Sequence, residues 1–108
     1  MLPLTPVAFE VLLSLAAEER HGYHIMQAVE HRTGGRITLH AGTLYRALAR
    51  LVDVELIEEL EERPDPATDE RRRYYRLTAF GRLVAEAEAA RLESQVRTAR
   101  ALHLLRKS

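Results

Sequence analysis

The spacing of apolar residues predicts two helices in the first third of the chain. Thr5 followed by Pro6 is typical of a helix start, and the apolar stretch that follows predicts a helix from Pro6 to about Glu18. A second helix is predicted from about Gly22 to Thr33. There, apolar residues recur at helical spacing until Gly34 and Gly35 end the pattern.

Two further helices are predicted in the rest of the chain. From Ala41 to about Val52 the helical period returns and places three leucines on one stripe, Leu44, Leu48 and Leu51. Thr78 can cap a last helix from about Ala79 to Leu105, which is longer than the average globular helix.

Three short segments have the pattern of strands. The residues from Arg36 to His40 alternate polar and apolar, which predicts a short strand. Residues 56–62 and Arg73–Leu77 flank a turn rich in proline and aspartate, which predicts a β-hairpin with a long exposed loop. The order helix, helix, strand, helix, hairpin, long helix is that of a winged helix-turn-helix. We therefore predict a mostly α fold with a small β-hairpin, in which residues 1–78 form the winged helix-turn-helix and residues 79–108 a dimerisation helix of the same structural unit.

The first and last helices both predict a homodimer. The first is apolar on nearly every side, and a chain of 108 residues has one small core, so a second copy is the simplest cover for the surplus face. The last carries small and apolar residues at alternating steps of four and three, as helices that pack on a partner helix do. The predicted dimerisation residues are Val7, Val11, Leu92, Val96, Ala99 and His103.

The formal net charge of zero, from 16 basic and 16 acidic residues, conceals segments of opposite sign. Every charged residue from Asp53 to Glu62 is acidic, whereas a basic cluster follows soon after it. That cluster consists of Arg71, Arg72, Arg73 and Arg76. Arginine suits bidentate contact with phosphate or guanine better than lysine does, so the choice of partner depends on where these arginines lie.

The predicted helix Ala41–Val52 and the hairpin together indicate DNA binding. Opposite its leucine stripe, this helix presents Thr43, Arg46 and Arg50 to a major groove, with Tyr45 at the flank within reach of a phosphate. The hairpin arginines Arg71, Arg72 and Arg73 would bind the adjacent backbone or the minor groove, and Tyr23 is a weaker candidate for a phosphate contact. Structural alternatives remain for several of these residues: Thr43 as part of the helix start, Tyr45 as a packed ring, and the hairpin arginines as partners of glutamates across the strands.

Other classes of function receive less support from the sequence. There is no cysteine, no apolar run of about 20 residues and no export signal at the amino terminus, so we expect a cytoplasmic protein without a membrane partner. The five histidines do not cluster with carboxylates at ligand spacing, so neither a metal nor another cofactor is predicted. Phosphate-binding glycine loops and hydrolase motifs are absent, and we therefore predict that the chain is not an enzyme.

Two rival hypotheses belong to other classes. The acidic segment Asp53–Glu62 would suit a winged-helix module that binds a basic protein instead of DNA. Alternatively, the alanines of the last helix leave room for a ligand between protomers, in a ligand or metal sensor for which binding of the effector is the primary event.

Three segments resemble the PadR-type transcriptional regulators. They are His21-Gly22-Tyr23, the stretch Gly42-Thr43-Leu44-Tyr45-Arg46-Ala47-Leu48, and the stretch from Arg73 to Gly81, Arg-Tyr-Tyr-Arg-Leu-Thr-Ala-Phe-Gly. The resemblance covers nearly the whole chain and implies a homodimeric DNA-binding regulator, usually a repressor, whose terminal helix exchanges with that of its partner. It also implies, in part of the family, a small-molecule effector at the dimer interface. The chain looks like the short subfamily, and it lacks the tryptophans between which some members hold flat aromatic effectors.

Overall fold

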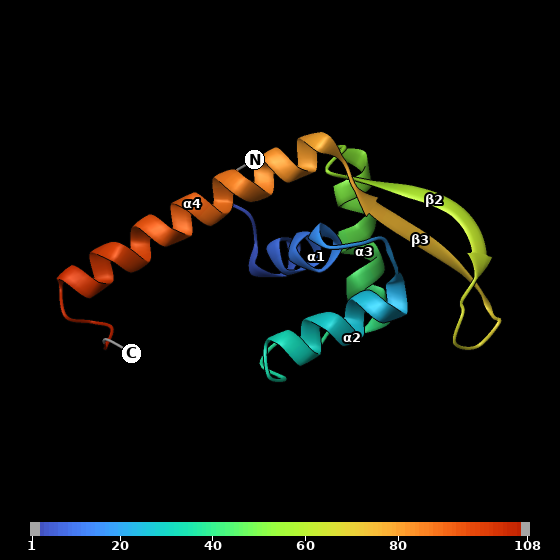
Figure 1. The fold of residues 1–108 in the computed structure, drawn as a ribbon, viewed down its shortest axis with the longest axis horizontal. Coiled ribbons are helices and arrows are strands. Elements are labelled where there is room, and N and C mark those ends of the chain that lie inside the picture. The colour runs from blue at the N-terminus through green and yellow to red at the C-terminus, as the bar shows by residue number, and fades with distance from the viewer. Residues whose placement is uncertain (1–2, 107–108) are drawn as a thin grey trace.

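The computed structural model describes residues 3–106, and over that range the chain forms four helices and a three-stranded antiparallel sheet (Figure 1). The elements are α1 (Pro6–Ala16), β1 (Arg20–His21), α2 (Gly22–Arg32), α3 (Ala41–Asp53), β2 (Ile57–Pro64), β3 (Arg71–Leu77) and α4 (Ala79–Ala101). The fold is mostly α with a small hairpin, as predicted. The outer ends of the two predicted units, residues 1–2 and 107–108, lie outside the described range.

A single core lies where α1, α2 and α3 meet the base of the sheet. The leucine stripe of α3 packs into it as predicted, with Leu44 and Leu48 almost completely buried. Val84 extends the core to the first turns of α4. The face of α3 opposite its leucines is therefore left on the surface.

The predicted strand at Arg36–His40 is wrong. This segment is an irregular loop in which Ile37 and Leu39 turn inward, and that burial explains the alternating pattern. The third strand of the sheet is instead β1, which precedes α2 and pairs with β3, Arg20 opposite Tyr75 and His21 opposite Tyr74. The central strand β3 pairs with β1 on one edge and with β2 on the other. Where β1 is paired, β3 therefore has no free edge for a further strand.

The hairpin of β2 and β3 is the wing, and it extends beyond the helices (Figure 1). Its strands are paired from Ile57 opposite Leu77 to Pro64 opposite Arg71, with an irregularity between Glu59 and Glu62. Because β1 reaches only the middle of β3, the outer half of the wing is a two-stranded ribbon that the helices do not support along its length.

α4 begins at a capped turn that is packed closely on the end of α3. Thr78 caps the helix by accepting a hydrogen bond from the Gly81 backbone N–H at 2.8 Å, and its own hydroxyl donates to the Glu55 carbonyl at 2.7 Å. A side chain at Gly81 would overlap the carbonyl oxygen of Leu56, so only glycine fits there. The direction in which α4 leaves the body is thus set at its first turn.

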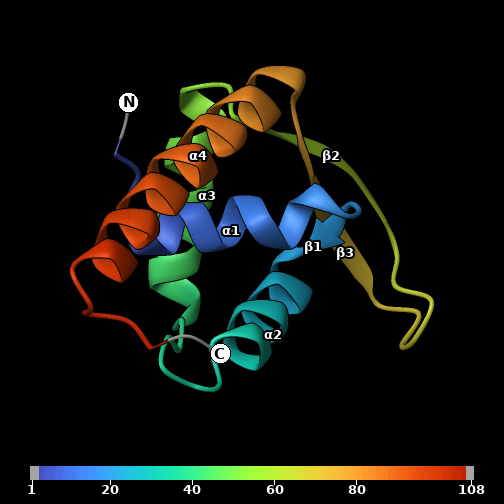
Figure 2. The same cartoon turned by 60° about the vertical axis from the view of Figure 1, so that its left-hand side comes forward.

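The other end of α4 lies well outside the body, and it ends earlier than the apolar pattern predicts. The helix stops at Ala101, where His103 adopts a left-handed conformation (φ 60°) and the Leu104 N–H bonds back to the Ala99 carbonyl at 2.8 Å. Figure 2 shows α4 crossing α1 and continuing past it. The radius of gyration, 15.4 Å, accordingly exceeds the ~13 Å expected of a compact domain of this length.

Two of the predicted dimerisation residues need correction. Val11 has no exposed surface, because the core of its own chain buries it completely. His103 follows the end of α4, and its left-handed backbone takes it off the helical stripe on which the prediction placed it. The burial of α1 by α2, α3, α4 and β3 also accounts for much of its apolar surface without a second copy.

Candidate nucleic-acid interface

The outward face of α3 carries two exposed arginines. Arg46 follows Leu44 by two residues, about 200° around the helix, and so points directly away from the core. Arg50 lies one turn further along and is also exposed. Over residues 3–106 neither guanidinium makes an ion pair or a side-chain hydrogen bond, so both are available to an external anion or base edge.

Thr43 and Arg50 share one flank of this face. Both line a hollow of about 430 Å³ between α3 and the segment that leads into α1. The helix start does not use the Thr43 hydroxyl: His40 is the N-cap of α3, without a side-chain capping bond, and no hydrogen bond of the Thr43 side chain occurs among the described residues. Thr43 is exposed, as a residue that contacts DNA would have to be.

Tyr45 occupies the other flank of α3, toward α2 and the wing. Half of its surface is exposed, and its ring lies so close to Gly22 that a Cβ at that position would be 2.6 Å from the Tyr45 hydroxyl. Tyr75 of β3 is buried beside it and donates a long hydrogen bond of 3.4 Å to Glu59. Burial, with the negative charge of Glu59 as a second cause, raises the pKa of Tyr75 to about 12. Tyr45 is therefore partly packed and partly exposed, and its predicted contact with a phosphate stays a prediction.

The wing arginines are already paired within the hairpin. Arg73 contacts Glu59 at 2.9 Å and Glu62 at 3.7 Å, and its hydrogen bond with Glu59 raises the pKa of the guanidinium. Arg72 contacts Glu70 at 2.6 Å, while Arg71 donates to a backbone carbonyl at 2.8 Å. The alternative role considered for these residues, partners of glutamates across the strands, is thus realised by Arg73 in the free protein, whereas Arg72 pairs with a neighbour in the chain and Arg71 with a backbone oxygen.

Tyr23 lies at the start of α2 and is half exposed beside the wing. The Arg72 guanidinium carbon is 5.8 Å from the centre of its ring, at the outer limit of a cation–π contact. Tyr23, Tyr45 and the wing arginines therefore flank α3 on the side of the sheet.

The structure assigns His21 a place that the sequence analysis did not recognise. Its Nδ1 accepts a hydrogen bond from the His24 backbone N–H at 3.2 Å and so caps α2, while its Nε2 lies 3.2 Å from a carboxylate oxygen of Asp65 in the wing turn. The ring also meets Tyr74 edge-on, with centroids 5.3 Å apart. The position of a histidine directly before an apolar helix could have indicated the cap, but the partner 44 residues away has no local pattern.

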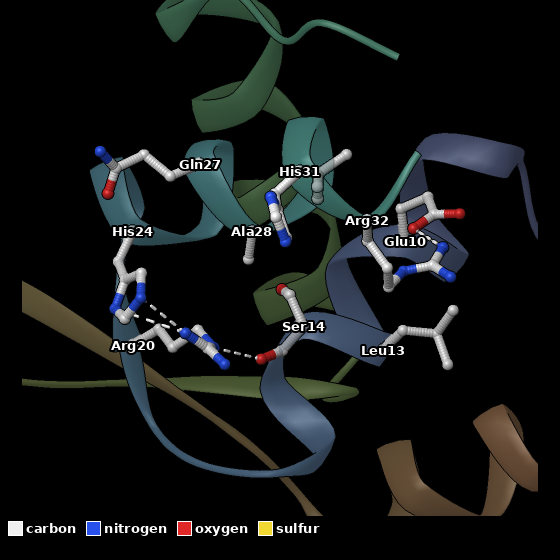
Figure 3. Close-up of a pocket in the computed structure, with 10 residues that line it drawn as sticks. Glu10, Leu13, Ser14, Arg20, His24, Gln27, Ala28, His31 and Arg32 are labelled. Carbon is white, nitrogen blue, oxygen red and sulfur yellow. Dashed lines mark hydrogen bonds and ion pairs between the residues drawn. The ribbon is translucent and has the colours of Figure 1, made fainter. Parts of the chain in front are cut away.

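A second hollow, of about 420 Å³, lies between α1 and α2 (Figure 3). Arg20 forms one wall, donating to the Ser14 carbonyl at 2.6 Å and lying 2.7 Å from His24 Nε2. Arg32 and Glu10 pair at the opposite end. Most of the charged groups on these walls, Arg20, Arg32 and Glu10, thus already have partners within the chain.

Two negative findings concern other functions. No three His, Cys, Asp or Glu side chains of the described residues gather as a metal site would require. None of the helices between residues 3 and 106 combines the length and apolar character needed to cross a bilayer.

The order of elements, the exposed face of α3 and the projecting hairpin define a winged helix-turn-helix protein. Comparison with known proteins agrees: the transcriptional regulator PadR-like family matches residues 11–87. The chain belongs to this family, whose members are transcriptional regulators and not enzymes. The predictions of the fold class, of the family and of a protein without enzymatic activity are therefore confirmed.

Solved structures show the same fold. A PadR-like transcriptional regulator from Bacillus cereus has a TM-score of 0.77 at 20% identity over 93% of both chains, and a PadR family regulator from Clostridium difficile one of 0.76 at 22% identity over 91% of this chain and 98% of that chain. Bacillus subtilis PadR, solved in complex with operator DNA, has a TM-score of 0.66 at 21% identity over 79% of this chain and 47% of that chain.

Two curated proteins also match in sequence. A 37.1 kDa protein in transposon TN4556 of Streptomyces fradiae is 43% identical over 89 residues, which make up 80% of this chain, and protein X of Lysinibacillus sphaericus is 32% identical over 72 residues, 67% of this chain. The matches span 24% and 64% of the lengths of those relatives.

Proposed function

We propose that this protein is a homodimeric transcriptional repressor that binds a pseudo-palindromic operator. The helices α3 of the two protomers would enter successive major grooves about one helical turn, ~34 Å, apart. The observation that carries the proposal is the exposure of Arg46, which has no ion pair within residues 3–106 and lies directly opposite the buried leucines of α3. The operator complex of Bacillus subtilis PadR, which shares the fold, supports DNA as the partner.

The proposed roles follow from position on α3. Arg46 reads a base, by bidentate contact with guanine, because it lies at the centre of the outward face. Arg50, Thr43 and Tyr45 lie on the flanks, where the phosphate backbones pass, and position the complex. Tyr23, beside the wing, is a further phosphate contact.

The wing has a smaller electrostatic role than its basic cluster predicts. Arg71, Arg72 and Arg73 would reach phosphates only by exchanging partners that they hold in the free protein, Glu62 and Glu70 among them. Arg73 pairs with Glu59 and Glu62, and Arg76 with Glu58, so part of the acidic strand is neutralised, which weakens the case for a module that binds a basic protein. DNA therefore remains the favoured partner of this face.

The dimer would form through α4. Its buried face, which includes Val84 and Glu88, continues at helical spacing through Leu92, which shares a hollow with Pro6 and Phe9 of α1, to Val96 and Ala99 nearer the end of the helix. Val96 is 39% exposed although it is apolar. A second copy would cover this continuation, and Val7 of α1, half-buried, would lie at its edge. The helix from residue 79 onward thus retains its proposed role as the dimerisation unit.

Release from the operator by a small-molecule effector at this interface is the remaining part of the proposal. Two arrangements of the protomers would hold the α3 helices at different spacings. An effector that binds one arrangement more tightly would shift the equilibrium toward it, to the extent set by its difference in affinity for the two. With chromosomal DNA as the partner, the proposed location is the cytoplasm.

Selection of bound sequences from a random pool of duplex DNA tests the proposal. We expect a site with two inverted half-sites about one helical turn apart, and affinity that falls steeply with salt. A module that does not act on DNA would enrich no sequence and would bind no duplex even at low salt. An asymmetric site would contradict the symmetric dimer while leaving DNA binding in place.

A further inference from the structure

Of the contacts between the outer part of the wing and the rest of the chain, the one that reaches the wing turn is made by a histidine; Arg63 with Glu19 and Arg72 near Tyr23 lie on the strands before and after the turn. His21 is 7% exposed and lies between three elements: it is the residue of β1 opposite Tyr74, the cap of α2, and the neighbour of the wing turn through Asp65. Pro64 and Pro66 flank Asp65, whose carboxylate is only 13% exposed. A contact at this point holds the turn at the end of the ribbon, beyond the strand contacts of Arg63 with Glu19 and of Arg72 with Tyr23.

The two nitrogens of the ring have different and compatible tasks. Nδ1 accepts from the His24 backbone N–H, so the proton of the neutral ring resides on Nε2, which faces the acceptor on Asp65. Burial is the main reason that the pKa of His21 lies below its usual value, and Asp65 opposes this shift. The neutral ring satisfies both neighbours, whereas protonation at Nδ1 would remove the helix cap.

The two carboxylate oxygens of Asp65 have different partners, and one of them faces His21. Its Oδ1 accepts from the Ala67 backbone N–H at 3.0 Å, and its backbone bonds Glu70, Thr68 and Asp69, so it organises the turn. Its Oδ2 is then left for His21, with Arg72 Nε further away at 3.9 Å. The hydrogen bond with Ala67 is the main cause that lowers the pKa of Asp65, with His21 and Arg72 adding to it.

Other charges face His21 from each surrounding element. They are His24 of α2, Arg72 of β3, Asp65 of the turn, and the residues that line the same hollow, Glu18, Glu19 and Arg63. Arg63 stacks 3.9 Å from the centre of the Tyr74 ring and pairs with Glu19, so its charge is balanced by a carboxylate of its own. Asp65 is thus the anion in direct contact with the ring.

The residue after His21 is the one that contacts α3. Gly22 accommodates the ring of Tyr45, so two consecutive residues connect the wing turn with the proposed recognition helix. We propose that His21 is a positioning residue that joins Asp65 in the wing turn to the start of α2, and so sets where the wing lies relative to α3. An effect of this contact on DNA binding rests on the proposed function, whereas the contact between His21 and Asp65 does not.

Conservative variants separate the joint from the structures around it. Asp65→Asn keeps the size and the oxygen that accepts from Ala67, but presents an amide donor to the donor on His21. Asp69→Asn is the matched control: it removes the same charge from the same turn, at a residue with φ 61° that asparagine tolerates well. His21→Asn keeps a side chain that caps α2 well but is too short to reach Asp65.

Binding is measured on the site selected from the random pool, at a temperature where circular dichroism shows every variant folded. Since each aspartate variant removes one negative charge near DNA, charge alone predicts equal or slightly tighter binding by both. We expect Asp65→Asn and His21→Asn to bind about tenfold more weakly, Asp69→Asn to stay within about twofold of wild type, and the double variant His21→Asn/Asp65→Asn to be no weaker than either single variant. Equal affinity of the two aspartate variants, or additive losses in the double variant, would overturn the proposal.

Two measurements without DNA separate this proposal from the proposed function. Since the chain has no cysteine, spin labels can be placed through Ala67→Cys in the turn and Ala49→Cys on α3, with labelled protein diluted into unlabelled. We expect Asp65→Asn, but not Asp69→Asn, to broaden the distance distribution and to lower the pKa of His21 measured by NMR. An unchanged distribution in Asp65→Asn refutes the joint, whereas a broadened one in a protein that binds no duplex refutes only the proposed function.

Discussion

Gly22 of α2 lies directly under the ring of Tyr45 of α3, and a Cβ at Gly22 would be 2.6 Å from the Tyr45 hydroxyl. The helix that precedes the proposed recognition helix therefore has a glycine where the two helices meet on the side of the wing. The atom in the way belongs to the end of a side chain, which can move, and not to the backbone. This contact consequently affects where Tyr45 lies more than whether the chain folds.

Gly22→Ala is expected to displace Tyr45 at little cost in stability. The free energy of unfolding should fall by about 1 kcal/mol or less, because the ring can swing outward, while affinity for the selected operator should fall several-fold. Thermal unfolding and operator binding measure the two effects. Adding Tyr45→Phe removes the hydroxyl closest to the new methyl group and should recover stability without recovering affinity; recovery of affinity would show that the hydroxyl does not contact DNA.

The two arginines of α3 should differ in the kind of affinity that they provide. Arg46→Ala is expected to weaken operator binding by ~1–3 kcal/mol and to relax selectivity at one base pair of each half-site. Arg50→Ala should weaken binding to all sequences alike and lower the salt slope by about 1. Repeated sequence selection and salt titration of each variant distinguish these outcomes, and unchanged affinity and selectivity in Arg46→Ala would refute its role.

Arg73→Ala is the control for these two variants. Because Arg73 is paired with Glu59 in the free protein, its removal should change the salt slope less than that of Arg50 does. An equal change would mean that Arg73 leaves Glu59 for a phosphate in the complex.

Gly81→Ala is expected to damage the fold itself. Here the new Cβ would overlap the Leu56 carbonyl oxygen, and backbone at the junction of α3 and β2 cannot move aside as a side chain can. We expect a loss of about 3 kcal/mol in the free energy of unfolding, seen in denaturant titrations. Gly42→Ala is the matched control, since its Cβ would meet nothing nearer than 3.8 Å and alanine favours a helix; it should be neutral or stabilising.

The contacts of Glu88 make the free energy of unfolding depend on pH in the acid range. Its side chain is buried on α4, bonded to Arg91 at 2.6 Å and to the Leu4 backbone N–H at 2.9 Å; the bond with Arg91 is the main cause that lowers the pKa of Glu88 below 4.5. The stabilisation is thus complete above the unfolded pKa and is lost as the pH falls through the folded pKa.

Glu88→Gln should therefore lower the melting temperature at pH 7, and the difference from wild type should shrink as the pH falls below about 4.5. Glu86→Gln, an exposed change on the same helix, should leave both the melting temperature and its pH dependence unaltered. A constant difference between Glu88→Gln and wild type from pH 7 to pH 3 would show that packing, and not charge, makes Glu88 important.

Local pattern was sufficient to predict the helices and the face of α3, because both depend on the helical period alone. The leucines of α3 fix which side is buried, and Arg46 must then be outside. The two-residue strand β1 has no period, and its partner Tyr75 lies 55 residues further on, so nothing near Arg20 indicates it. The wrong prediction of a strand at Arg36–His40 has the same cause. Alternating polar and apolar residues indicate which side chains are buried, but whether a segment pairs as a strand depends on which edge of the sheet is free.

The partners of the wing arginines depend on register, which composition does not contain. The irregularity between Glu59 and Glu62 decides which carboxylates face Arg73, and a shift of one residue would turn them to the other side. Likewise, Asp65 meets His21 only because the turn folds back over the start of α2. At the other end of the chain, leucines after Ala101 continue an apolar pattern, but the left-handed backbone at His103 ends the helix.

The proposed dimer makes a prediction about one exposed residue. Val96 lies in the last two turns of α4 and is exposed in the single chain, so a charge there costs a monomer little, whereas at a helix interface it would be buried without a partner. Val96→Glu is expected to convert the protein to monomers in sedimentation experiments and to abolish specific operator binding, because two correctly spaced α3 helices are needed. Ser94→Glu adds the same charge about 160° away around the helix and should remain a dimer. If Val96→Glu sediments as wild type does, α4 pairs through another face or not at all.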